Sequence, residues 1–164
     1  MLQNGHHMKL INKIFGNEFK LHQQTTEATV NGESKTITLK EYSKKVRMFG
    51  LSVTVAFDPE NVKIDLNEYI QQVEKKIKDI SKRKNQIEKR ISDKLLALKN
   101  STWLEEGENK IDEKKFINKL LLESVQFHED SFELYFEDGN LFLGHTIIYS
   151  EDKNGNLIDV NIAG

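Results

Sequence analysis

The sequence contains no cysteine, only one proline and no long apolar run. Without cysteine, the chain can form neither a disulfide framework nor a thiolate metal site, and it has no cysteine nucleophile. No window approaches the roughly 18 consecutive apolar residues that a membrane-spanning helix requires. The N-terminal stretch also lacks the apolar core and cleavage site of a secretory signal. These absences predict a cytoplasmic protein that makes no membrane contact.

The chain has 164 residues, of which 37% are hydrophobic and 30% charged. This length and composition predict one domain over residues 1–164 with a core of its own. The net charge of −2 hides an asymmetry, because residues 65–99 carry 10 basic and 6 acidic side chains whereas residues 100–164 carry 5 and 14. A basic middle segment therefore precedes an acidic C-terminal one.

The N-terminal part shows strand patterning after a flexible or partly helical segment, residues 1–16. Strands are predicted at Phe19–Thr25 and Thr36–Leu39, separated by Asn31-Gly32, a dipeptide that favours hairpin turns. A core strand is predicted over Val46–Phe57, and it ends before the only proline.

A long amphipathic helix is predicted over residues 65–99. Asp65 is a good N-cap, and Glu68 completes a capping box. An unbroken helix of this length would span about 50 Å, whereas a compact domain of this size has a radius of gyration of about 15 Å. We favour one continuous helix that overhangs the domain; the alternative is a bend or break in the polar run 81–85. The apolar stripe consists of Leu66, Ile70, Val73, Ile77, Ile80, Ile87, Ile91 and Leu98.

A short helix is predicted from the cap at Asp112 to about Lys119, and residues 120–164 then alternate as a β-meander. The expected fold class is therefore α+β, with an antiparallel sheet or sheets, one long helix and one short helix. The predicted meander strands cover residues 125–128, 132–137, 141–149 and 157–162.

Several residues of this C-terminal part carry a family resemblance. They are Trp103, Phe116, Phe132–Phe136, the run from Asp138 to Ile148, which includes the step Leu143-Gly144-His145, and the ending Asp159–Gly164. With them the chain resembles a bacterial family of uncharacterised proteins, the domain of unknown function twenty-two sixty-two, in which an aromatic residue often stands where this chain has Leu143. The resemblance implies a small accessory protein, of the immunity or antitoxin kind, and no reaction.

One candidate catalytic set is His145 with Asp138 and Asp159, because an imidazole beside carboxylates can act in acid–base chemistry. The alternative, which we favour, is that His145 makes a structural hydrogen bond after a glycine that permits a bulge. No nucleophile elbow or phosphate-binding glycine loop accompanies the set. An enzyme of unknown reaction is thus the second hypothesis.

Metal and cofactor signals are weak. His128 with Glu129 and Asp130, or His145 with Asp138, are the places where ligands could gather, but neither has a ligand spacing. No metal and no cofactor are predicted.

The basic face of the helix supports a third hypothesis, nucleic-acid binding, although no aromatic residues are interleaved with it. The same face could instead meet the acidic sheet of a second copy and form a homodimer. Its basic residues are Lys75, Lys76, Lys78, Lys82, Arg83, Lys84, Lys89 and Arg90.

The leading hypothesis is a non-enzymatic protein-interaction module. The acidic outer face of the meander would steer a basic partner toward it, as an immunity protein meets a toxin. Trp103 is a candidate surface anchor, with core packing as the favoured alternative. The acidic residues assigned to this face are Glu133, Glu137, Asp138, Glu151 and Asp152.

Overall fold

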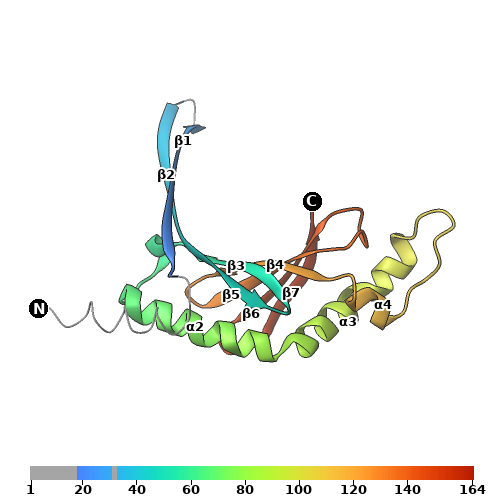
Figure 1. Cartoon of the computed structure of the whole chain (residues 1–164). Coiled ribbons are helices and arrows are strands. Elements are labelled where there is room, and N and C mark those ends of the chain that lie inside the picture. The colour runs from blue at the N-terminus through green and yellow to red at the C-terminus, as the bar shows by residue number, and fades with distance from the viewer. Residues whose placement is uncertain (1–17, 31–32) are drawn as a thin grey trace, which may run out of the picture.

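The computed structural model describes residues 18–30 and 33–164, and the predicted segment 1–16 and the turn at Asn31-Gly32 lie outside them. Within these described residues seven strands form one sheet in chain order, and the helices α2 and α3 cover one of its faces (Figure 1). The strands are β1 (Lys20–Val30), β2 (Glu33–Met48), β3 (Leu51–Phe57), β4 (Leu121–Phe127), β5 (Ser131–Glu137), β6 (Thr146–Asp152) and β7 (Leu157–Ala163). The helices are α2 (Leu66–Lys82), α3 (Lys84–Thr102), α4 (Glu113–Ile117) and the 3-10 turn η1 (Pro59–Asn61).

The sheet is antiparallel except between β3 and β4, where Val55 lies opposite Val125 in a parallel pair. Parallel neighbours cannot be joined by a tight turn, so the chain must cross over the sheet between them. Residues 58–120, which include the helices α2, α3 and α4, form this crossover. The expected α+β class and the C-terminal meander β4–β7 are confirmed, but the sheet is not wholly antiparallel.

The long predicted helix is two helices. Asp65 caps α2 as predicted, since its carboxylate accepts hydrogen bonds from the N–H groups of Asn67 at 2.9 Å and Glu68 at 3.1 Å. The prediction of a continuous helix is wrong, because α2 ends at Lys82 and α3 begins at Lys84. At the junction Arg83 has φ −98° and ψ 16°, outside helical geometry. The break thus falls in the polar run 81–85, the alternative considered from the sequence.

The bend keeps both helices on the sheet. Ile80 and Ile87, on either side of the junction, are fully buried. A straight continuation would carry the apolar residues of α3 beyond the strands and into solvent, at a cost of about 1.5–3 kcal/mol for each large side chain. Burial of the α3 stripe therefore favours the break over the overhang.

Several strand boundaries differ from the predictions. The strands predicted at Phe19–Thr25 and Thr36–Leu39 are the longer strands Lys20–Val30 and Glu33–Met48. The segment Val46–Phe57 is a hairpin and not one strand, because Phe49 and Gly50 turn the chain with φ values of 54° and 86°. Strand β6 begins at Thr146, since residues 138–145 form a loop. The hairpin preserves the alternation on both sides of the turn, and for this reason the pattern resembles one strand.

The sheet buries one face and exposes the other. Toward the helices it presents an apolar layer that includes Val55, Phe57, Phe132 and Leu134, all fully buried. Phe57 meets Tyr69 of α2 edge to face with ring centroids 5.0 Å apart. The opposite face, which we call the open face, carries the alternate residues of each strand, as the meander patterning predicted.

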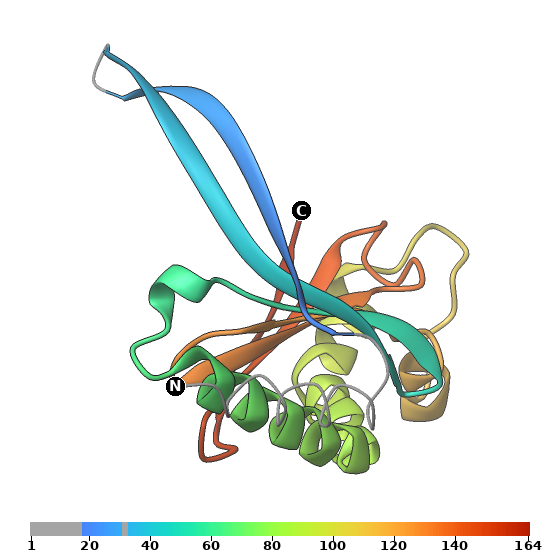
Figure 2. The same cartoon turned by 60° about the vertical axis from the view of Figure 1, so that its left-hand side comes forward.

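The hairpin β1–β2 extends far beyond the other strands. Its base, from Tyr42 onward, pairs with β3, whereas residues 22–30 and 33–41 pair only with each other. We call these residues the arm; nine residues of a strand span about 30 Å. In both views the arm leaves the sheet on the side away from α2 and α3 (Figures 1 and 2).

Candidate functional site

Asp138 organises the loop between β5 and β6 and is 1% exposed. Its carboxylate accepts hydrogen bonds from the backbone N–H groups of Asn140 at 2.8 Å, Phe142 at 2.6 Å and Gly144 at 3.2 Å. These three hydrogen bonds bind the carboxylate to the backbone of its own loop. Asp138 is therefore not part of the exposed acidic face to which the sequence assigned it.

His145 ends the same loop, and its half-buried ring lies against neighbouring groups. Its Nδ1 lies 2.5 Å from the carbonyl oxygen of Phe142, and the ring centroid is 5.3 Å from that of Trp103. Gly164 passes so close that a Cβ there would lie 2.6 Å from the ring. This is the structural hydrogen bond that the sequence favoured for His145.

Asp159, the third member of the candidate catalytic set, lies elsewhere. It is an exposed residue of β7 opposite Ser150, whereas Ala163 of the same strand lies opposite Thr146, the residue after His145. Its carboxylate accepts a hydrogen bond from the amide of Asn161 at 3.1 Å. The structure does not gather the three side chains into one acid–base site.

Trp103 lies at the end of α3 and packs against the core. Its ring meets that of Phe142 edge to face at 5.5 Å, and its carbonyl oxygen accepts a hydrogen bond of 2.7 Å from the buried ammonium of Lys99. Of the two interpretations, surface anchor and core packing, the contacts favour packing.

Glu133 and Glu137 lie on the open face of β5. The Tyr135 hydroxyl donates to Glu133 at 2.6 Å, and burial followed by this hydrogen bond raises the pKa of Tyr135 to about 12. Glu137 is exposed and lies opposite Thr146 of β6 in the sheet. Together with Asp159, these carboxylates give the open face of the meander its negative charge.

Glu151 corrects the prediction of an acidic outer face, because it is fully buried beneath the junction of α2 and α3. Its carboxylate accepts two hydrogen bonds of 2.9 Å from the guanidinium of Arg83 and one of 2.7 Å from Arg90. The Tyr149 hydroxyl also donates to it. Burial and then this bond raise the pKa of Tyr149 to about 12, and hydrogen bonding to Glu151 raises the pKa of Arg83.

The sequence contained a signal for this cluster that was missed. Glu151 has the same parity in its strand as the buried Ile147 and Tyr149, so alternation alone places it on the helix side. An acidic residue on the buried face of a strand needs a cationic partner. Arg83, inside the polar run of the helix, is the partner that the tertiary structure supplies.

Other acidic residues of the C-terminal segment are also bound by the chain itself. Asp130 accepts from Lys153 at 2.6 Å. Asp152 accepts from the side-chain amide of Asn156 at 2.8 Å and from the N–H of Asn154 at 2.8 Å, and it closes the turn after β6. These hydrogen bonds hold the pKa values of both carboxyl groups below their usual range. Much of the acidic excess is thus internal, and Glu133, Glu137 and Asp159 remain on the open face.

The arm adds exposed apolar side chains to this side of the molecule. Leu39 is 58% exposed and Ile37 38% exposed. They lie opposite Gln24 and Thr26 of β1, and their parity along β2 is that of Ser43 on the open face. Among the described residues, the outer edge of β1 has no strand paired with it.

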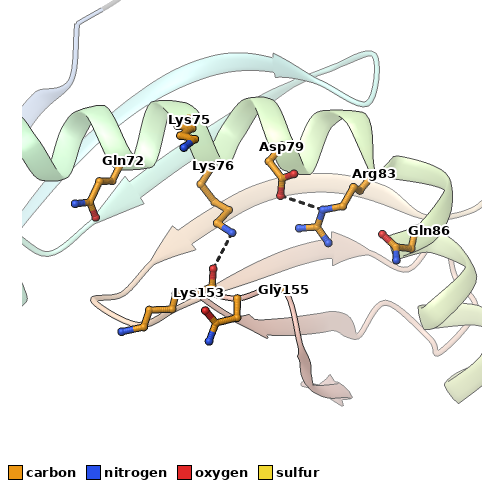
Figure 3. A pocket seen from close by; sticks show the side chains of 9 residues that line it. Gln72, Lys75, Lys76, Asp79, Arg83, Gln86, Lys153 and Gly155 are labelled. Carbon is orange, nitrogen blue, oxygen red and sulfur yellow. Dashed lines mark hydrogen bonds and ion pairs between the residues drawn. The ribbon is translucent and has the colours of Figure 1, made fainter.

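A cleft of about 590 Å³ lies on another part of the molecule, between α2 and the turn that joins β6 to β7 (Figure 3). Lys76 donates to the carbonyl oxygen of Lys153 across it at 3.1 Å, and Arg83 donates to Asp79 at 3.0 Å. Its lining consists of Gln72, Lys75, Lys76, Asp79, Arg83, Gln86, Lys153, Asn154 and Gly155.

Four residues of the basic helix face have anionic partners within the molecule. Arg83 and Arg90 hold Glu151, Lys84 lies 3.5 Å from Glu88, and Lys89 pairs with the carboxylates of Asp93 and Glu113. The nucleic-acid hypothesis is weakened, because these cations already have anionic partners.

The described residues include no group of three or more potential metal ligands. His128 lies 3.4 Å from Glu133, while Glu129 pairs with Lys63 and Asp130 with Lys153. Likewise, no helix in residues 18–30 and 33–164 is long and apolar enough to cross a membrane.

Comparison with known proteins gives one family. The model of a family described as "Uncharacterized protein conserved in bacteria (DUF2262)" matches residues 34–162, from β2 into β7. No curated protein and no solved structure matches the chain.

Proposed function

Because the chain belongs to this bacterial family of uncharacterised proteins, DUF2262, whose description gives no activity, we propose a function from its surfaces: a non-enzymatic module that binds a partner protein. The arm and the open face of the sheet form the binding surface. The observation that carries the proposal is the arm. Its two strands extend past the rest of the sheet and pair only with each other.

A two-stranded hairpin by itself is only marginally stable in water. This one also exposes Leu39 and Ile37 and leaves the outer edge of β1 unpaired. An exposed edge of this kind favours pairing with another chain. A partner that covers the arm would bury these side chains and satisfy the free backbone groups.

The charges of the open face indicate the character of the partner. Glu133 and Glu137 lie on β5 and Asp159 lies on β7. Lys45 and Arg47 lie on β2 at the base of the arm. A partner with a basic surface over the meander would be attracted electrostatically, which mainly raises the association rate. An immunity-like protein that covers a basic toxin would use such a surface.

Site-specific photo-crosslinking in the native bacterial host tests the proposal. A photoreactive amino acid at Leu39 and, separately, at Glu137 should trap the same partner protein. The matched control is Lys94, an exposed residue of α3 on the opposite side of the sheet. Adducts equal to those from Lys94, or none from either open-side position, would contradict the proposal.

A further inference from the structure

We propose that the cleft between α2 and the β6–β7 turn binds a small organic phosphate of about nucleotide size. The site is separate from the arm and the open face, and it rests on a different observation. Its volume of about 590 Å³ lies within the roughly 300–1,000 Å³ of small-molecule sites.

The charge of the cleft selects an anion. Four of its lining side chains are cationic and one, Asp79, is anionic. Arg83 is neutralised by Asp79 and Glu151, and Lys153 by Asp130. Lys76 donates to the carbonyl of Lys153 and lies 5.8 Å from the centroid of the Phe132 ring, and within the described residues it forms no ion pair with a carboxylate.

Lys75 is the second cation available to a ligand. Within residues 18–30 and 33–164 it has no ion pair, and it is exposed at the rim. Two ammonium groups that line one cleft, each with three rotatable donors, suit the oxygens of a phosphate. The amides of Gln72 and Asn154 supply neutral donors and acceptors for the rest of the molecule.

A smaller hollow of about 70 Å³ adjoins the cleft and shares Gln72, Lys76 and Lys153 with it. Its walls include the aromatic rings of Tyr69, Phe127 and Phe132. A ligand with an apolar group next to its phosphate would therefore use both compartments. A bare inorganic ion would fill only part of the space.

Titration by NMR is suited to a chain of 19.0 kDa. ATP is the organic phosphate probe and inorganic pyrophosphate the bare one. We expect saturable shifts of the backbone amides of Asn154 and Gly155 at about 0.15 M salt, with ATP binding more tightly than pyrophosphate. The double variant Lys75→Gln/Lys76→Gln should weaken ATP binding about tenfold.

The control Lys94→Gln/Lys114→Gln removes the same charge from exposed positions outside the cleft and should change the affinity less than twofold or so. Circular dichroism verifies that both double variants are folded. Absence of saturable shifts, or equal weakening in both variants, would overturn the proposal. A single-stranded oligonucleotide that binds more tightly than ATP and shifts amides along all of α2 and α3 would also overturn it, in favour of nucleic acid.

Discussion

The buried carboxylate of Glu151 should be among the most sensitive positions of the fold. It accepts hydrogen bonds from Arg83, Arg90 and Tyr149 at the junction of α2 and α3. In Glu151→Gln the side chain keeps its shape, but it loses its charge and directs an amide N–H₂ group toward guanidinium donors. The substitution removes one partner and leaves two cations under the helices.

Removing one member of a buried ion pair costs about 3–5 kcal/mol. The side chains of Arg83 and Arg90 are 20% and 29% exposed, so water can solvate part of the released charge. We therefore expect a loss near the lower limit, about 3 kcal/mol in the free energy of unfolding. For a chain of this size, that loss corresponds to a Tm lower by about 6–12 °C.

Urea unfolding measures the loss, with circular dichroism and the fluorescence of Trp103 as two probes. The control is Asp93→Asn, which removes an exposed carboxylate from the ion pair with Lys89 on α3. Its expected cost is below about 1 kcal/mol. The reasoning is refuted if the free energy of unfolding of Glu151→Gln lies within about 1 kcal/mol of that of the unsubstituted protein and the two probes give coincident unfolding curves.

Three further predictions concern other buried polar groups. Asp138→Ala leaves three backbone N–H groups without their acceptor and should cost about 2–4 kcal/mol in urea unfolding, whereas Asp159→Ala on the exposed strand should cost less than about 0.5 kcal/mol. Lys99→Met removes the ammonium that holds the pKa of Glu108 below its usual range. The pKa of Glu108, followed by NMR, should therefore rise, and amide exchange in residues 104–110 should become faster. An unchanged pKa of Glu108 would contradict the contact. Burial raises the pKa of Glu88, so the Glu88 carboxyl group favours folding at low pH, and this stabilisation is lost as the pH rises through its pKa in the folded state. Glu88→Gln should therefore be more stable than the unsubstituted protein at pH 7. It should lose this advantage near about pH 4. A variant that is less stable at pH 7 would show that the ion pair with Lys84 outweighs burial.

Local signals in the sequence predicted the parts of the fold that depend on neighbouring residues. Alternation in residues 132–137 identified the buried and open faces of β5, because side chains of a strand change face at every residue. The caps Asp65 and Asp112 were predicted correctly, since an N-cap acts on N–H groups two or three residues away. The family membership was likewise contained in the C-terminal residues.

The tertiary structure decided what depends on distant contacts. The parallel pairing of β3 with β4 requires a crossover of residues 58–120, and no local pattern specifies which strand pairs with β3 after the crossover. The helix breaks at Arg83 because the sheet offers a buried surface and the carboxylate of Glu151 beneath it, 68 residues later in the chain. Charge counts made the C-terminal segment look like one acidic surface, and folding divided it into buried, internally paired and exposed carboxylates. The sequence alone determined the alternation and the caps, because these act between near neighbours, whereas only the fold determined which charges remain available to a partner, because that depends on contacts between distant segments.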